Sequence, residues 1–255
     1  MHASRPLPPR RGGQFHAPDL FLLTIVTINR DNEAGLPKTL QSLEKVRQHP
    51  DVECIFVDGA SADRSVDIAR SFYAPDNLIS EPDTGIYSAM NKGLSKARGK
   101  YVLWLNSGDE LHESLNVGAL LVVLRNSSAH LISGATLFCS YSTGAIRDIF
   151  RPKVDKLPYA TLPHPSSFFL RTGAIELGGY DESFKIAGDR DLIVRIHMAD
   201  RPIEVIEHLI ARFYDGGISD QALACLENKR INFQNGLISR LHYFAGVLLF
   251  WVNSK

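Results

Sequence analysis

Polar side chains follow four predicted strands of this sequence at the points where the strands end. They are Asn29 and Asp31 after the apolar run Phe21–Ile28, Asp58 after Val52–Val57, Glu81 and Asp83 after Asn77–Ser80, and Asn106, Asp109 and Glu110 after Tyr101–Leu105. In open parallel sheets, ligands bind outside the carboxyl ends of the strands, so these groups are expected to meet at one edge. Each one alone could be an ordinary turn or cap residue. Groups of this kind at four strand ends together favour a binding site.

The glycine pattern excludes two common ways of holding phosphate. The segment TINRDNEAG after the first run lacks G-x-G-x-x-G, and the chain has no G-x-x-x-x-G-K-[ST]. Carboxylates instead indicate a hard cation such as Mg²⁺ or Mn²⁺, which can hold diphosphate oxygens while keeping its own waters.

From Leu20 onward, short β-rich runs alternate with amphipathic stretches, which predicts an α/β fold with a largely parallel sheet. Helices are expected over 34–46, up to about Phe72, over 86–97 with Gly99 just past its end, over 115–125 and over 188–198. Later runs such as LISGATLFC and AIRDIF indicate antiparallel strands, and strands are expected near 203–206 and 209–214. No linker divides this body, so we expect one domain with two halves.

Charge and composition exclude several classes of protein. Of the 28 basic and 28 acidic residues, the stretch from Leu20 to Ser219 holds 21 and 25, so an acidic body has two basic ends. Such a body would repel nucleic-acid phosphates, and nucleic-acid binding is not expected. The 44% hydrophobic content argues against disorder, and three scattered cysteines indicate neither a disulfide framework nor a zinc site. A reducing cytoplasm fits this cysteine usage.

Three segments together resemble a known family. DGASAD, SEPDTGIYSAMNKGLSKARGKYVLWLNSGDE and GGYDESFKIAGDRDLIVRI resemble the nucleotide-binding, metal-binding and acceptor segments of family 2 glycosyltransferases, close to the exopolysaccharide or colanic-acid-type branch. The resemblance covers about Leu20 to Ser219. It implies a GT-A fold with a mixed central sheet and C-terminal helices. It also implies inverting transfer of a sugar from a nucleotide donor, chiefly a UDP-sugar, to a glycan or polyprenyl-linked acceptor in polysaccharide biosynthesis.

The same resemblance assigns donor and metal contacts. Thr27 and Asn29 match the first-strand motif that borders the nucleotide, and Asp58 matches the carboxylate that accepts a hydrogen bond from uracil. LNSGDE falls where the family has D-x-D. Asn106 replaces the first Asp there and stays a donor-binding candidate, which leaves Asp109 as the expected Mn²⁺ or Mg²⁺ ligand.

Asp189 in AGDRDL matches the family's general base, although Gly188 stands where the family usually has Glu. An inverting transfer needs one carboxylate that removes the acceptor hydroxyl's proton as that oxygen attacks. Asp191 is a weaker candidate, because a carboxylate in the first turn of a helix has a structural use. His164 is expected either at the diphosphate or acceptor, or as a turn histidine between two prolines.

Three further residues are donor-side candidates with structural alternatives. Asp83 could bind the donor or cap the helix near Ile86, and Lys92 could reach a phosphate or lie in solvent. Asp215 precedes Gly216 and Gly217 in a segment expected to contact metal or diphosphate.

The ends of the chain are expected to differ from the body. Residues 1–18 are interpreted as a flexible arm, 19–219 as the catalytic domain and 220–255 as a helical tail beginning with a helix over 221–235. The apolar stretch Leu241–Val252 is too short to span a bilayer. It is expected either to dock on the core or to lie in the headgroups at the inner face of the plasma membrane, near a lipid-linked acceptor.

Two other functions stay open at this point. A GT-A-like module could bind nucleotide sugar or glycan without transfer, as the altered D-x-D segment and the missing Glu before Asp189 suggest. A nucleotidylyltransferase is less consistent, since the Gly-rich signature of those enzymes is absent after Thr27.

Overall fold

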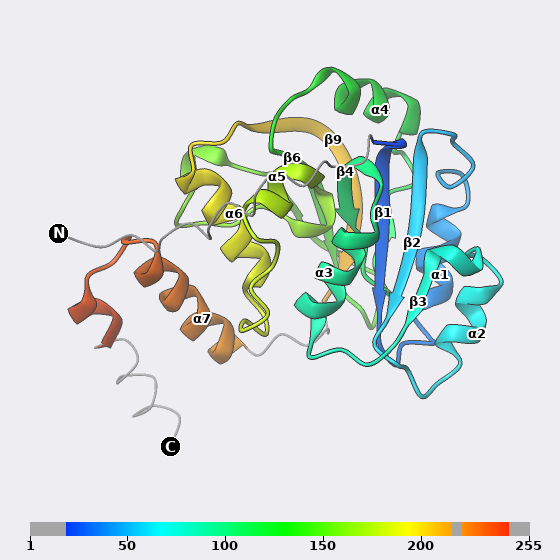
Figure 1. Cartoon of the computed structure of the whole chain (residues 1–255), viewed down its shortest axis with the longest axis horizontal. Coiled ribbons are helices and arrows are strands. Elements are labelled where there is room, and N and C mark those ends of the chain that lie inside the picture. Colours follow the sequence, from blue (N-terminus) through cyan, green and yellow to red (C-terminus); the bar gives the residue numbers. More distant parts are fainter. Residues whose placement is uncertain (1–18, 216–220, 245–255) are drawn as a thin grey trace.

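Four parallel strands form one half of a nine-stranded sheet in the computed structural model, which describes residues 19–215 and 221–244 (Figure 1). They lie in the order β3-β2-β1-β4, so the four strand ends carrying the predicted polar groups are adjacent. Their bounds are β1 Phe21–Asn29, β2 Val52–Asp58, β3 Leu78–Ser80 and β4 Gly99–Trp104.

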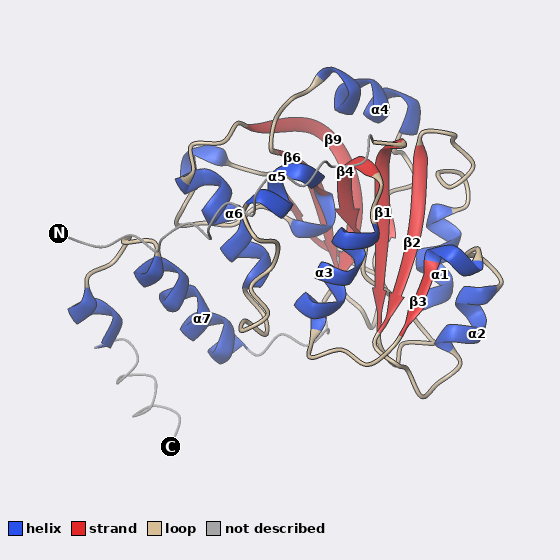
Figure 2. Ribbon diagram, viewed as in Figure 1, coloured by secondary structure: helices blue, strands red, loops and turns tan. Residues whose placement is uncertain are grey.

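The other half of the sheet is mixed (Figure 2). Its strands are β5 Glu110–Leu111, β6 Leu131–Cys139, β7 Ile146–Phe150, β8 Ser167–Leu170 and β9 Ile203–Tyr214. The predicted antiparallel pairing of β6 with β7 is confirmed, but β6 and β9 run parallel. The two strands expected near 203–214 are one strand whose register against β6 is irregular.

Helices cover both faces of the sheet. The helices α1 Leu36–Leu43, α2 Ser65–Arg70 and α4 Val117–Asn126 pack on one face, and α3 Ile86–Lys96, α5 Arg171–Glu176 and α6 Gly188–Met198 on the other. Short 3₁₀ turns lie at Pro75–Asn77, Val154–Lys156 and His164–Ser166. In β1, Val26 and Ile28 join one core and Leu23 and Ile25 the other, as the alternation of side chains along a strand requires. Burial on both faces explains why this strand is continuously apolar.

Gly99 has a different role from the one predicted. Helix α3 ends at Lys96, and Gly99 is the first residue of β4 rather than a helix-ending residue. A Cβ at Gly99 would lie 2.5 Å from the backbone nitrogen of Thr24. Glycine is therefore required by the close approach of β4 to β1.

The predicted C-terminal helix is present as α7, Gln221–Gln234, and it packs against α6 (Figure 1). Ile231 joins the core, whereas Leu241 is 81% exposed. Residues 1–18 and most of the stretch Leu241–Val252 lie outside the described residues. Within 19–215 and 221–244, no helix is long and apolar enough to cross a membrane.

Candidate active site

Asp58 organises the carboxyl end of β2. Its Oδ1 accepts hydrogen bonds from Asn29 Nδ2 at 2.9 Å and from Ser61 Oγ, and its Oδ2 accepts from Ser61 N and Ser80 Oγ, both at 2.9 Å. The side chain is 1% exposed. Four donors fill the lone-pair positions of a carboxylate. A contact between Asp58 and a uracil ring, as predicted, would therefore require one of these protein bonds to yield.

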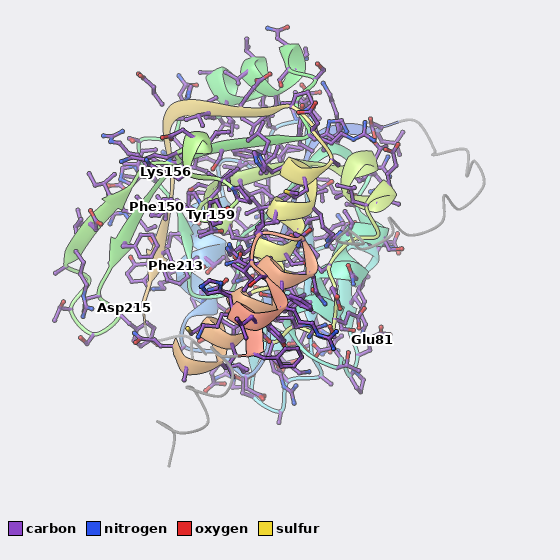
Figure 3. The ribbon with its side chains drawn as sticks, turned by 90° about the vertical axis from the view of Figure 1, so that its left-hand side faces the viewer. Glu81, Phe150, Lys156, Tyr159, Phe213 and Asp215 are labelled. Atoms are coloured by element: carbon purple, nitrogen blue, oxygen red, sulfur yellow. The ribbon has the colours of Figure 1, made fainter. Side chains whose placement is uncertain are left out.

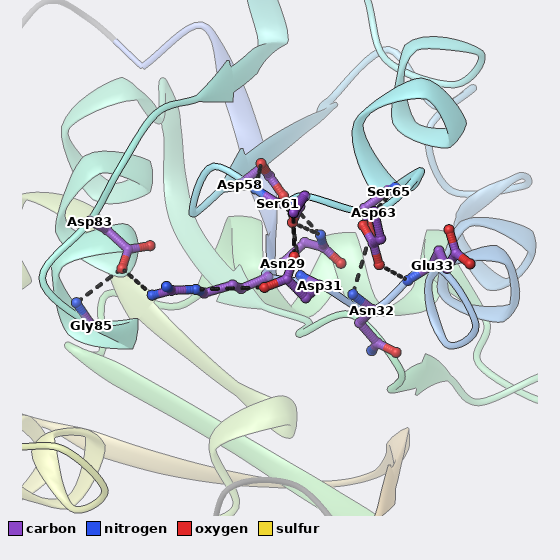
Figure 4. Close-up of polar contacts among 12 residues, drawn as sticks. Asn29, Asp31, Asn32, Glu33, Asp58, Ser61, Asp63, Ser65, Asp83 and Gly85 are labelled. Carbon is purple, nitrogen blue, oxygen red and sulfur yellow. Dashed lines mark hydrogen bonds and ion pairs between the residues drawn. The ribbon is translucent and has the colours of Figure 1, made fainter.

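The loops after β1 and β2 are fastened to each other (Figure 4). Asp31 N donates to Ser61 Oγ at 2.8 Å, and Ala62 N donates to Asp31 Oδ1 at 2.7 Å. Further along, Glu33 N donates to Asp63 Oδ2 at 2.8 Å. Asp31 and Ala60 have positive φ angles of 46° and 58°, a strained backbone conformation that often occurs at binding sites. The two strand ends thus form one rigid rim.

Asn29 and Asn106 each have a buried side-chain oxygen that accepts no hydrogen bond from any described residue. Asn29 is the last residue of β1 and Asn106 follows the neighbouring strand β4. Asn32 links the loops after these two strands by donating to Ser107 O at 2.9 Å. Buried polar atoms are normally paired. Two unpaired acceptors at adjacent strand ends are suited to hydroxyl or N–H groups of a ligand.

Asp83 and Lys92 lie at the end of β3. Asp83 Oδ1 accepts from Gly85 N at 3.0 Å and lies 3.8 Å from Arg30 Nη1, so Asp83 holds the turn before α3 without being its N-cap (Figure 4). A side chain at Gly59 would collide with the Asp83 carboxylate. Lys92 Nζ donates to Pro82 O at 2.8 Å and pairs with Glu81 at 2.9 Å. Asp83 therefore adjoins the rim, while Lys92 braces its loop.

Asp109 is bound to β9 in the structure. Its Oδ1 accepts from Tyr214 N at 3.2 Å, and burial raises the pKa of this carboxyl to about 7. Neighbouring Glu110 accepts from the Tyr214 hydroxyl at 2.9 Å and lies 3.9 Å from Lys38 Nζ. These contacts follow from the pairing of β5 with β9, which the sequence did not indicate.

The surroundings of Asp109, the predicted metal ligand, do not suit a hard cation. Hard cations prefer ionised, accessible oxygen ligands. Asp109 is buried against β9, and Asn106 supplies an amide in place of a carboxylate. Within the ranges that the structure describes, no group of three or more His, Cys, Asp and Glu side chains could hold a metal ion.

Asp189 lies in the first turn of α6, beside α3. The hydroxyl of Tyr87 donates to Ile186 O and lies 3.5 Å from Asp189 Oδ1. The loop before α6 also contacts the loop after β3, because Lys185 Nζ donates to Thr84 O at 3.2 Å. Asp189 is partly exposed. A partly exposed carboxylate therefore lies next to the turn that joins β3 to α3.

Tyr87 explains the glycine that precedes Asp189. A Cβ at Gly188 would lie 2.8 Å from the Tyr87 ring. The ring is buried, stacks on Tyr180 at 5.6 Å between centroids, and is anchored through its hydroxyl. Tyr87 occupies the space that a side chain at position 188 would need.

His164 is buried near Asp189 in an aromatic cluster. Its Nε2 shares a hydrogen bond of 2.9 Å with the Tyr180 hydroxyl, and its ring stacks on Trp104 at 5.7 Å. Burial lowers the pKa of His164, and the Asp189 charge opposes that shift only in part. These contacts hold the imidazole in the neutral form beneath the start of α6. The predicted contact of His164 with a diphosphate or acceptor stays a prediction.

Asp191 and the two arginines of α6 have structural partners. Asp191 is buried and pairs with Arg195 at 2.8 Å, while Arg195 also donates to the carbonyls of Leu177 and Gly179 at 2.6 Å. Arg190 donates to Pro158 O at 2.7 Å and to Asn232 Oδ1 at 2.8 Å. These contacts support the structural interpretation of Asp191.

The side chains of Thr27 and Asp215 have their partners away from the rim. Thr27 is fully buried and accepts from the Tyr73 hydroxyl at 3.0 Å. Asp215 accepts from Tyr141 N at 3.0 Å and pairs with Arg147, which fastens the β6–β7 hairpin to β9. Figure 3 shows Asp215 near Phe213 and well separated from Glu81 at the end of β3. Residues 216–220, including the two predicted loop glycines, lie outside the described residues.

Comparison with known proteins identifies the family. The sequence profile of glycosyl transferase family 2 matches residues 23–177, more than half of the chain. The chain belongs to glycosyl transferase family 2. A PGL/p-HBAD biosynthesis glycosyltransferase of Mycobacterium bovis is 28% identical over 215 residues, covering 80% of each chain. A putative teichuronic acid biosynthesis glycosyltransferase of Bacillus subtilis, TuaG, is 27% identical over 136 residues, covering 52% of this chain and 54% of TuaG.

Solved structures confirm the predicted GT-A fold. TarS of S. aureus in complex with UDP-GlcNAc superposes with a TM-score of 0.67 at 17% identity, covering 91% of this chain and 72% of TarS. The mannosyltransferase PcManGT of Pyrobaculum calidifontis, in complex with GDP-Man and Mn²⁺, superposes with a TM-score of 0.60 at 15% identity. The match covers 90% of this chain and 69% of PcManGT. The mixed sheet of this family 2 member is the architecture that the resemblance implied.

Several residues of the site were not found from the sequence. Ser61 and Ser80 complete the Asp58 network, Tyr87 adjoins Asp189, and Glu227 of α7 binds the loop before α6. Ser61 lies within the quoted DGASAD segment, which was a usable signal. Glu227 binds residues about 40 positions earlier in the chain, and a contact over that distance has no local sequence pattern that would predict it.

Proposed function

We propose that this protein is an inverting glycosyltransferase that moves a sugar from a UDP-sugar to a glycan or polyprenyl-linked acceptor. Family membership supports glycosyl transfer, and structural neighbours in complex with UDP-GlcNAc and GDP-Man support a nucleotide-sugar donor. The observation that carries the proposal is the position of Asp189, partly exposed at the start of α6 and joined through Tyr87 to the helix that follows β3.

Asp189 would act as the general base. Its carboxylate takes the proton of the acceptor hydroxyl while that oxygen forms a bond to the anomeric carbon. The bond between that carbon and the diphosphate oxygen breaks on the opposite face, and the nucleoside diphosphate leaves. Positioning of both substrates supplies much of the acceleration in such a step.

The rim, together with the neighbouring end of β4, would bind the donor. The unpaired oxygens of Asn29 and Asn106 offer acceptors for ribose hydroxyls or a base N–H. Asp58 keeps its predicted role toward uracil if Ser61 or Ser80 gives up a bond. Asp83 lies at the edge of the same rim and is retained as a donor contact.

A divalent cation, when bound, would neutralise part of the diphosphate charge. GT-A glycosyltransferases commonly use one, and PcManGT is described with Mn²⁺. Because the described residues do not form a set that fits, no step above depends on a metal.

The acceptor, the branch of the family and the cellular location remain part of the proposal. The relatives are named for PGL/p-HBAD and teichuronic acid biosynthesis, so a place in exopolysaccharide synthesis rests on the sequence resemblance. A polyprenyl-linked acceptor would place the enzyme at the inner face of the plasma membrane.

A donor screen tests the nucleotide. The thermal midpoint is measured with UDP-, GDP- and dTDP-sugars, each with and without Mn²⁺, because a ligand that binds only the native state raises its stability. Stabilisation by UDP-sugars with release of UDP in the presence of acceptor is expected. Stabilisation by GDP-sugars alone would contradict the UDP assignment, and UDP-sugar binding without turnover would favour a non-catalytic binding module.

A further inference from the structure

Glu227 of α7 is a buried carboxylate that accepts hydrogen bonds from the backbone of the loop before α6. Its Oε1 accepts from Lys185 N at 2.7 Å, and its Oε2 accepts from Ile186 N at 2.9 Å and Ala187 N at 2.8 Å. The side chain is 6% exposed. Three consecutive N–H groups converge on one carboxylate, which is a strong, charge-assisted arrangement.

The same segment is held from its other side by α3. The Tyr87 hydroxyl donates to Ile186 O, so the N–H and the C=O of one residue are bound by two different helices. Asp189 follows three residues later, in the first turn of α6, with Tyr87 at 3.5 Å. The direction in which α6 begins is therefore set by Glu227 and Tyr87 together.

Docking of α7 does not by itself explain this carboxylate. The helix is also attached through Asn232, whose Oδ1 accepts from Arg190 at 2.8 Å, and through Ile231, which is fully buried. Those contacts join α7 to α6 without touching the N–H groups of 185–187. The two oxygens of a carboxylate can accept from all three N–H groups, which precede the helix and have no partner within it.

We infer that Glu227 is a positioning residue that fixes the 185–187 segment and thereby the place of the Asp189 carboxylate. This inference rests on the proposed role of Asp189 as the base. It assigns part of the predicted C-terminal tail to the active site.

The test compares Glu227→Gln with the matched control Asn232→Ala in the full chain. Both remove polar contacts of α7, but only the first alters the N–H cluster. We expect Glu227→Gln to lower kcat by about 10- to 100-fold, since small displacements of a catalytic group have effects of this size. The Kd of UDP should stay within about twofold of the wild-type value, because the contacts of Glu227 are in the loop before α6 and not at the rim. Asn232→Ala should lower the thermal midpoint and keep kcat.

Amide hydrogen exchange provides a second measurement that does not depend on turnover. The amides of 185–187 should exchange faster in Glu227→Gln than in the wild type, and at the wild-type rate in Asn232→Ala. Equal kcat in wild type and Glu227→Gln, or unchanged exchange at 185–187, would overturn the inference. If Glu227→Gln does not fold, Glu227→Asp, which keeps the charge, takes its place with the same expected directions.

The outcomes separate this inference from the proposed function. A wild type that transfers no sugar from any donor contradicts the proposed function, and with it the role of Glu227 in catalysis. An active wild type, inactive Asp189→Asn and fully active Glu227→Gln would leave the proposed function standing and reject the inference alone.

Discussion

Asp58 and Asp189 are two carboxylates of the candidate site with opposite surroundings. Asp58 is buried and accepts four hydrogen bonds from protein groups, whereas Asp189 is partly exposed and has Tyr87 at 3.5 Å. A carboxylate with its lone pairs filled holds loops in place. One that keeps accessible surface can meet a substrate hydroxyl.

Replacing Asp58 with Asn tests its part in the rim. The amide of Asp58→Asn would present N–H groups to donors that now meet an oxygen, leaving buried donors unpaired. We expect the free energy of unfolding to fall by about 1–3 kcal/mol in denaturant titration. The control Glu81→Gln changes an exposed carboxylate at the end of β3 and should shift stability by less than about 0.5 kcal/mol. Equal losses in both variants would contradict this role of Asp58.

His164 makes stability depend on pH. Burial holds its pKa below the ordinary value of 6.5, so the unfolded chain binds the proton more readily than the folded one. The stabilisation is therefore complete above pH 6.5 and is lost as the pH falls below it. The loss attributable to this group has a slope of at most about 1.4 kcal/mol per pH unit.

The variant His164→Gln should lack this component. Its free energy of unfolding, measured by denaturant titration from pH 7.5 to 5, should decline less steeply than that of the wild type. Parallel curves for the two proteins would show that His164 is not buried in the neutral form.

At the scale of elements, the start of α6 depends on its packing against α3. The absence of a side chain at Gly188 lets the Tyr87 ring fit beside the first turn of α6. The two helices therefore lie close together at this point.

Gly188→Ala tests the close approach of the two helices. The added methyl group would lie 2.8 Å from an anchored ring, and overpacking of this kind costs about 1–3 kcal/mol. The control Gly118→Ala lies near the start of α4, where the added Cβ would be 3.5 Å from Asn116 Oδ1, and it should stabilise the protein by up to about 1 kcal/mol. A neutral or stabilising effect of Gly188→Ala would contradict this packing. Adding Tyr87→Leu to the Gly188→Ala variant should recover part of the lost stability, and no recovery would also contradict it.

Local patterns predicted the elements that position the rim. The parallel strands were predicted because β1, β2 and β4 are apolar runs followed by turn residues, and α6 was predicted with the bounds Gly188–Met198 that the structure has. The β5–β9 pairing could not be predicted, because β5 has only two residues and its partners, including Arg212 opposite Glu110, lie about a hundred positions later in the chain. That pairing turns Asp109 toward Tyr214, so its surroundings were not visible in the LNSGDE pattern.

At the scale of the whole molecule, the C-terminal region divides into two parts. Residues up to Ile231 are packed into the body through α7, whereas Leu241 and Phe244 are 81% and 53% exposed. The first part holds the loop before α6 through Glu227. The second part, together with 245–255, which lie outside the described residues, is the segment predicted either to dock on the core or to lie at a membrane.

Removal of residues 239–255 tests the membrane prediction. The shortened protein should keep its fold, because Glu227 and Ile231 are retained, and should lose binding to vesicles of anionic phospholipid. Apolar side chains and basic groups both contribute to such binding. The measurement is co-sedimentation with vesicles of phosphatidylglycerol against phosphatidylcholine. Undiminished binding by the shortened protein would contradict the predicted membrane contact of this tail.

Asp189 is proposed to remove the proton of the acceptor hydroxyl. The measurement compares UDP release in the presence of acceptor by the wild type and Asp189→Asn, with the Kd of UDP measured for both. We expect a loss of at least about 100-fold in kcat, the usual contribution of a general base, with UDP binding retained. Turnover by Asp189→Asn close to that of the wild type would contradict it.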